Sequence, residues 1–82
     1  MTSQTQIIDA AVHCAHLFRL GRDIEGALEM VDVIDAAMPL ASSGQQAEWT
    51  QVLGAILQCQ ERQDWIGVAD WLEVEFVALC RD

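Results

Sequence analysis

One apolar pattern occurs twice along the chain, and both copies have the spacing of a helix. A shift of 41 residues aligns four identical pairs: Asp23 with Asp64, Gly26 with Gly67, Val33 with Val74 and Ala37 with Ala78. A fifth pair, Met30 and Trp71, keeps a large apolar side chain at the matching position. Two copies of a helical hairpin are typical of repeat and interaction proteins. The pattern therefore predicts two related hairpins.

Four segments carry apolar residues three and four positions apart, which indicates helices. We expect these helices over about residues 5–20, 24–38, 45–62 and 65–80. Ser3 or Thr5 is expected to cap the first helix, and Gly21 to end it in a left-handed conformation. Asp23 and Asp64 are expected to cap the second and fourth helices.

The connections predict how these helices are arranged. Within each half the loop is too short for anything but antiparallel neighbours. Residues 39–44, beginning with Pro39, form the linker between the halves. We therefore expect a single all-α domain over residues 1–82, in which four antiparallel helices form two hairpins, about 5–38 and 45–80. Either a helical repeat or a four-helix bundle satisfies this pattern.

The second and fourth predicted helices each carry two apolar stripes. The first stripe, expected to face the core, comprises Ile24, Ala27, Leu28, Val31, Ile34 and Met38, and then Trp65, Val68, Ala69, Leu72, Phe76 and Leu79. The second stripe comprises Gly26, Met30, Val33, Ala37, Gly67, Trp71, Val74 and Ala78. Two interpretations of it stay open: it completes the core, or it is a dimer or partner-binding interface anchored by Met30 and Trp71.

Composition limits the classes of partner. Hydrophobic residues make up 52% of the 82 residues, more than one small core usually hides, which favours a protein partner or a homodimer. The net charge is −9 and there is no lysine. Nucleic acids and anionic membrane surfaces are therefore disfavoured, since both are bound through Lys and Arg.

Targeting and redox signals indicate a cytoplasmic protein. The first apolar run is interrupted by Asp9 and His13, so it resembles neither a signal peptide nor a membrane span. Three cysteines without a C-x-x-C spacing argue against a disulfide framework.

Residues that could carry chemistry are few. His13 and His16 share a helix face while Cys14 points about 100° away from His13, so these three cannot converge on one metal ion. The two histidines could bind a metal together with Cys59 or Cys80 if folding gathered them. The alternative is exposed imidazoles and core cysteines, and we expect no metal site and no cofactor. Without a nucleophile beside a base, a carboxylate pair or a phosphate loop, we expect no enzyme.

Residues 8–41 resemble one tetratricopeptide repeat. The apolar positions and the closing proline of that family's pattern are matched in order by Ala15, Phe18, Ile24, Ala27, Val31 and Pro39. The resemblance implies a helical hairpin that binds a peptide or protein. In size, acidity and helical character the chain is also similar to small cytoplasmic chaperones of flagellar and type III secretion systems.

These patterns predict a non-enzymatic protein–protein interaction module, such as a small chaperone or adaptor. An apolar groove between the second and fourth helices would bind an amphipathic helix of a partner. The alternative is an acidic inhibitory protein, such as an immunity protein or antitoxin, that covers a basic active site.

Overall fold

The computed structural model describes residues 3–40 and 43–81, and it is all-α over these residues, with four helices and no strand, as expected. The first three helices are α1 (Gln4–Arg19), α2 (Asp23–Ala37) and α3 (Gln46–Glu61). The fourth helix is continuous but has three parts: α4 (Trp65–Asp70), the π-helical segment η3 (Trp71–Phe76) and α5 (Val77–Arg81). Within the predicted linker, η1 (Met38–Leu40) and η2 (Ser43–Gln45) are short 3₁₀ turns, and residues 41–42 lie outside the described part.

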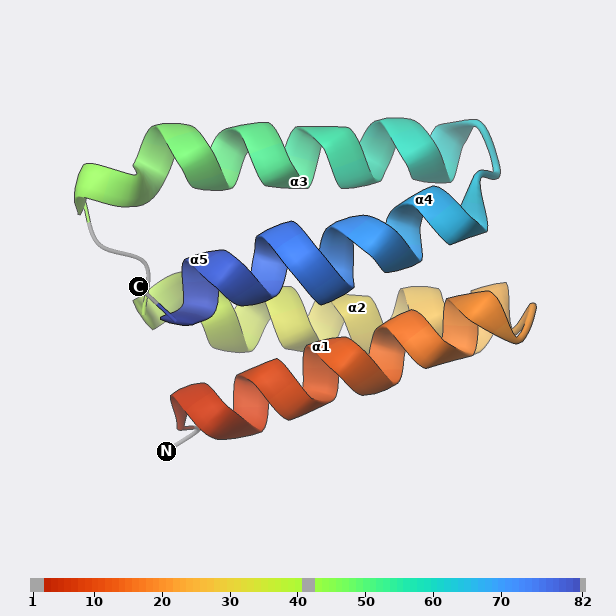
Figure 1. Ribbon diagram of the computed structural model, residues 1–82, viewed down its shortest axis with the longest axis horizontal. Coiled ribbons are helices and arrows are strands. Elements are labelled where there is room, and N and C mark those ends of the chain that lie inside the picture. The colour runs from red at the N-terminus through yellow and green to blue at the C-terminus, as the bar shows by residue number, and fades with distance from the viewer. Residues whose placement is uncertain (1–2, 41–42, 82) are drawn as a thin grey trace.

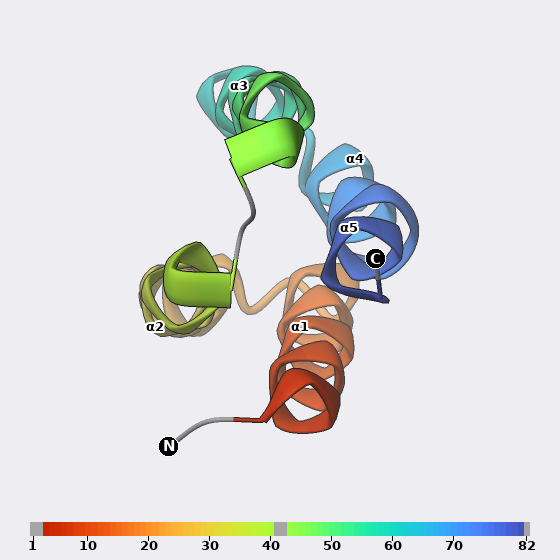
Figure 2. The ribbon, with the colours of Figure 1, turned by 90° about the vertical axis from the view of Figure 1, so that its left-hand side faces the viewer.

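Figure 1 shows successive helices running in opposite directions, with the start of α1 and the end of α5 at the same end of the molecule. The end-on view of Figure 2 shows α1 beside both α2 and the fourth helix. α1 makes most of its helix contacts with these two, and α3 packs mainly on the fourth helix. α2 and α3 make few close backbone contacts, so α2 covers the core from one side and leaves its far face to solvent.

Two helix starts are stabilised by side chains. Ser3 and Gln6 form a capping box at the start of α1, in which the Ser3 hydroxyl accepts from the Gln6 amide. Asp64 caps α4 by accepting from the amide of Gly67, as predicted. The prediction for Asp23 was wrong: Arg22 is the N-cap of α2, no side chain caps that end, and Asp23 is the first helical residue.

The two hairpin turns have the same construction. Gly21 has φ +79°, as predicted, and Gln63 has φ +57° at the corresponding place in the second turn. In each turn the next amide returns to a carbonyl five residues earlier, from Arg22 to Leu17 and from Asp64 to Cys59. Each turn is therefore a Schellman motif, in which a left-handed residue ends the helix.

All four helices contribute to one core. Its largest fully buried side chains are Phe18, Phe76, Ile7, Ile56 and Leu72. Phe18 stacks on Trp65 with ring centroids 5.7 Å apart, which joins α1 to the fourth helix. A Cβ atom on Gly26 would lie 3.0 Å from Cζ of Phe18, so the lack of a side chain there lets α2 approach α1 closely.

The first predicted stripe is buried in the fourth helix but not in α2. Val68, Ala69, Leu72, Phe76 and Leu79 are buried as expected, and Trp65 is half-buried. In α2 the assignment is reversed. The buried residues are Gly26, Met30, Val33 and Ala37, the α2 half of the predicted interface. Of the residues expected in the core, Ile24, Leu28, Val31 and Met38 are exposed, whereas Ala27 and Ile34 are half-buried and pack against the core.

This reversal has a geometric cause, because the turns and helix starts of the two hairpins correspond at a shift of 42 residues rather than 41. Matching pairs at this shift share turns, N-caps and burial: Gly21 with Gln63, Arg22 with Asp64, Ile7 with Trp49 and Met30 with Leu72. One residue corresponds to about 100° of rotation around a helix. Aligning Asp23 with Asp64 therefore assigned the wrong face of α2 to the core.

Candidate interaction surface

The most exposed apolar surface follows the outer face of α2. Leu20, at the end of α1, is 73% exposed, and Ile24, Leu28 and Val31 are 74%, 68% and 56% exposed. We call these four residues the outer strip. Ile24, Leu28 and Val31 are spaced four and three residues apart, so they share one helix face. That face is turned away from the core because the opposite face of α2 is buried.

An acidic border runs beside the outer strip. A shallow groove of about 490 Å³ lies between α1 and α2 and is lined by His13, Leu17, Arg22, Glu25, Leu28, Glu29 and Asp32. Leu28 therefore belongs to both the strip and the groove. A partner lying along the strip would place its edge against the carboxylates of this groove.

Few positive charges neutralise this border. Nδ1 of His13 lies 2.9 Å from a carboxylate oxygen of Glu29, and Arg22 lies 3.8 Å from Glu25. Over its whole length α2 has five carboxylates and no lysine or arginine. The surface around the outer strip is thus apolar in the middle, acidic along one side, and followed on the same helix face by Asp35, a pattern that complements basic groups.

The other basic residues of α1, His16 and Arg19, face the fourth helix. Nη2 of Arg19 donates to Asp70 at 2.8 Å and to Glu73 at 3.0 Å, and the hydrogen bond to Asp70 is the main cause of a raised Arg19 pKa. His16 lies 3.6 Å from the same Glu73. These pairs hold α1 against the fourth helix on the opposite side from α2, and so lie away from the outer strip.

The fourth-helix half of the predicted interface lies elsewhere. Gly67 is half-buried at the cap, where a Cβ atom would collide with Asp64, so its role is local. Trp71 is half-buried, whereas Val74 and Ala78 are exposed. Trp71 and Ala78 line a shallow groove of about 380 Å³ between α3 and the fourth helix. The two halves of the predicted interface do not form one surface, since the α2 half is in the core.

The histidines and cysteines are not gathered into a cluster. His13 faces Glu29 on α2 and His16 faces Glu73 on the fourth helix. Cys14 is buried, and its pKa is raised to about 12. Burial is the larger cause, and the nearby negative charge of Glu29 is the smaller one. Among the described residues no three His, Cys, Asp or Glu side chains lie together as metal ligands would.

The outer strip was missed because its residues were assigned to the core. The small residues Gly26 and Ala37 are the sequence feature from which the outer strip could have been predicted. Small residues at both ends of a stripe allow close helix approach, and here the neighbour is α1 of the same chain. That stripe then belongs inside, and the remaining apolar stripe of α2 must face outward.

No protein-family model, curated protein or solved structure matches the chain. No helix in the described part of the chain has the length and hydropathy needed to cross a bilayer.

Proposed function

We propose that this protein is a non-enzymatic interaction module that binds an amphipathic helix of a partner protein along the outer strip. The observation that carries the proposal is the row of three large exposed apolar side chains on α2, preceded by exposed Leu20, beside the acidic groove of α1 and α2. The partner helix would place its apolar face on the strip and lysine or arginine side chains against Glu25 and Asp32.

Burial of the strip supplies the affinity. Full burial of a leucine, isoleucine or valine side chain contributes about 1.5–3 kcal/mol relative to exposure. Two such side chains, Ile24 and Leu28, are together worth a factor of at least ~100 in the dissociation constant. Ile24 and Leu28 are four residues apart, and so are neighbouring apolar residues on one face of a partner helix that lies along α2.

Charge favours a different protein over a second copy of this chain as the occupant. Two α2 helices face to face would bring together two sets of five carboxylates with no lysine or arginine on either helix. Like charges across an interface weaken association, whereas lysine or arginine on a partner accelerates it. A small chaperone or adaptor that covers the apolar face of a basic helix would use the surface in this way.

A defined peptide tests the proposal. The probe is a fluorescein-labelled 18-residue helical peptide with a leucine stripe and lysines along its edges, titrated with protein and followed by anisotropy. We expect saturable binding that weakens at least tenfold in the double variant Ile24→Ser and Leu28→Ser. The matched control is the double variant Leu57→Ser and Ile66→Ser, which removes two apolar side chains that are 56% and 53% exposed on α3 and α4 and should leave binding unchanged.

Three outcomes would contradict the proposal. Equal losses in the two double variants would mean that the peptide adheres to any apolar surface. If a peptide with glutamate in place of lysine bound as tightly as the lysine peptide, the acidic border would not contribute to binding. A stable dimer in light scattering that the Ile24 and Leu28 variant dissociates would make a second copy the occupant.

A further inference from the structure

The groove between α3 and the fourth helix lies on the other side of the bundle from α2 (Figure 2). The half-buried Trp71 lines it together with the buried, apolar Val52 and Leu79. The exposed Glu48 and Glu75 add one carboxylate from each helix. Among the described residues no arginine or histidine pairs with either of these two carboxylates. The groove therefore combines an aromatic side chain with two negative charges that have no counter-charge.

Trp71 and Glu75 also line an adjoining hollow of about 330 Å³. Val74, which is 60% exposed, and Asp70 complete its lining. Asp70 already accepts a hydrogen bond from Arg19 at 2.8 Å, so Val74 and Trp71 supply most of the surface that a ligand could use there. A ligand that fills both the groove and the adjoining hollow needs a positively charged part and an apolar part.

The π-helical segment η3 places these side chains on the surface. At the shift of 42 residues Val33 corresponds to Glu75, yet Val33 is 3% exposed in the core and Glu75 is exposed. The next residue, Phe76, is buried instead. A π-helical hydrogen bond encloses one residue more than an α-helical one, so the segment turns Glu75 outward beside Trp71. Single π-helical turns inside helices are rare and occur frequently at functional sites.

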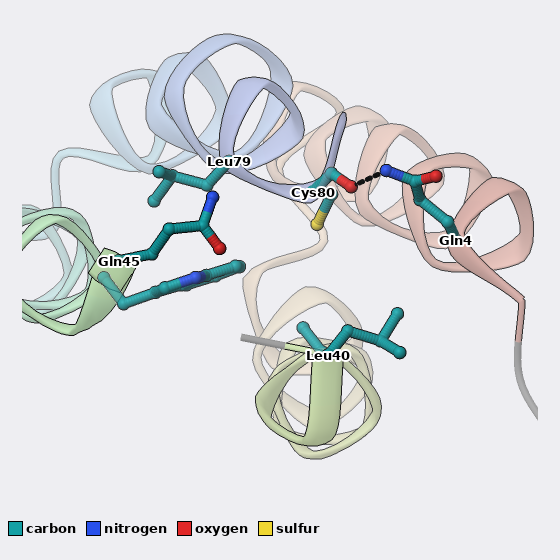
Figure 3. Close-up of a pocket in the computed structure, with 7 residues that line it drawn as sticks. Gln4, Leu40, Gln45, Leu79 and Cys80 are labelled. Carbon is teal, nitrogen blue, oxygen red and sulfur yellow. Dashed lines mark hydrogen bonds between the residues drawn. The ribbon is translucent and has the colours of Figure 1, made fainter. Parts of the chain in front are cut away.

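α1 holds the fourth helix on both sides of this segment. Arg19 donates to Asp70 at 2.8 Å and to Glu73 at 3.0 Å. Near the other end, the side-chain amide of Gln4 donates to the carbonyl of Cys80 (Figure 3). A wall that is fixed before binding loses less conformational entropy when a ligand is bound.

We propose that this groove binds an arginine side chain of a partner protein, with a large apolar side chain of the same segment against Val74 and Trp71. The guanidinium group is planar, stacks on aromatic rings and donates to carboxylates, which matches Trp71 with Glu48 and Glu75. The adjoining hollow favours a peptide segment over free arginine, because a single amino acid cannot fill both. The net charge of −9 on each copy opposes a second copy of this chain as the occupant. This surface is separate from the outer strip, so it does not depend on the proposed partner helix.

The test uses two peptides that differ only in charge, acetyl-Ala-Leu-Arg-Ala-amide and the same peptide with citrulline, the neutral isostere of arginine. Each is titrated into ¹⁵N-labelled protein at about 20 mM salt, because exposed ion pairs are screened at higher ionic strength. The indole N–H signals, assigned by triple-resonance NMR, report binding. We expect the arginine peptide to shift the Trp71 signal saturably, leave that of Trp65 in place, and bind about fivefold more tightly than the citrulline peptide.

Two charge-matched double variants locate the site. Glu48→Gln with Glu75→Gln should weaken binding of the arginine peptide about fivefold and leave binding of the citrulline peptide unchanged. Asp32→Asn with Asp35→Asn removes the same charge from α2 and should leave both affinities unchanged. All four positions are exposed and the substitutions are isosteric, so both variants retain the fold.

Four results would overturn the inference. The absence of a saturable Trp71 shift up to about 20 mM arginine peptide would mean that the groove does not bind it. Equal affinity for the two peptides, or equal losses in the two double variants, would leave only attraction by the overall charge. If free arginine bound as tightly as the peptide, the ligand would be a small molecule. A dimer that the Glu48 and Glu75 variant dissociates would make a second copy the occupant.

Discussion

The rotation of α2 about its own axis leads to a sharp prediction at two neighbouring valines. Val31 is 56% exposed on the outer strip, and Val33 is 3% exposed in the core. The same substitution, valine to aspartate, should therefore have very different effects at positions two residues apart in one helix. Valine and aspartate have similar helix propensities, so the difference between the variants reports burial.

The magnitudes follow from the two environments. Val33→Asp loses about 1.5–2 kcal/mol of apolar burial. It also places an unpaired carboxyl group in the core, which costs roughly 1–3 kcal/mol more. A chain of 82 residues has a total stability of about 4–12 kcal/mol, so a combined loss of about 2.5–5 kcal/mol removes a large part or all of it. Val31→Asp adds a surface carboxylate four residues from Asp35, at a cost below about 1 kcal/mol.

Thermal unfolding followed by circular dichroism measures the difference. For a domain of this size 1 kcal/mol corresponds to about 4–8 °C in Tm. Val31→Asp should lower the Tm by less than about 8 °C, and Val33→Asp by about 10 °C or more, or leave the chain unfolded at 25 °C. If Val33→Asp cannot be purified, Val33→Thr and Val31→Thr give the same comparison with a hydroxyl group. Equal destabilisation at the two positions, or the reverse order, would refute the orientation of α2 and with it the outer strip.

Two further predictions concern the turns and a buried thiol. Because Gly21 and Gln63 both have positive φ, Gly21→Ala should lower the free energy of unfolding by about 1 kcal/mol and Gln63→Gly should raise it by a similar amount. Urea unfolding checks this, and equal signs would contradict it. The pKa of Cys14 is raised from 9.0 to about 12 by burial, so above pH 9 the thiol ionises in the unfolded chain but not in the folded one. Stability should therefore fall as pH rises from 9 toward 12, with a shallower fall in Cys14→Ala, and identical pH slopes for the two proteins would rule out this contribution.

Local patterns predicted the helices, two of the helix starts and the first turn. Ser3, Gly21 and Asp64 act as expected because each interaction involves only backbone a few residues away. Gln63 was not recognised as a left-handed residue, since glutamine has no preference for positive φ and the turn imposes it. Asp23 was misassigned by one residue for a related reason: an aspartate just inside a helix resembles one at its cap.

The candidate surface could be predicted only in part. The sequence shows that α2 carries two apolar stripes and several carboxylates, so it already indicates that one apolar face meets acidic residues. Which face is buried depends on what α2 packs against, and the repeat pattern does not contain that information. The hydrogen bond from the side-chain amide of Gln4 to the carbonyl of Cys80 was not predictable, because these residues are at opposite ends of the chain.

By itself the sequence determined the all-α class, the four helices and their approximate limits, because helix periodicity and caps are properties of neighbouring residues. It also determined that the surface is acidic, since the chain has 13 aspartates and glutamates and only four arginines. Only the tertiary structure decided the rotation of α2. The ring of Phe18 fits against Gly26, where there is no side chain, and this contact turns Met30 and Val33 inward and Leu28 outward. Two stripes of nearly equal hydrophobicity differ little in transfer free energy, so close packing against α1 selects between them.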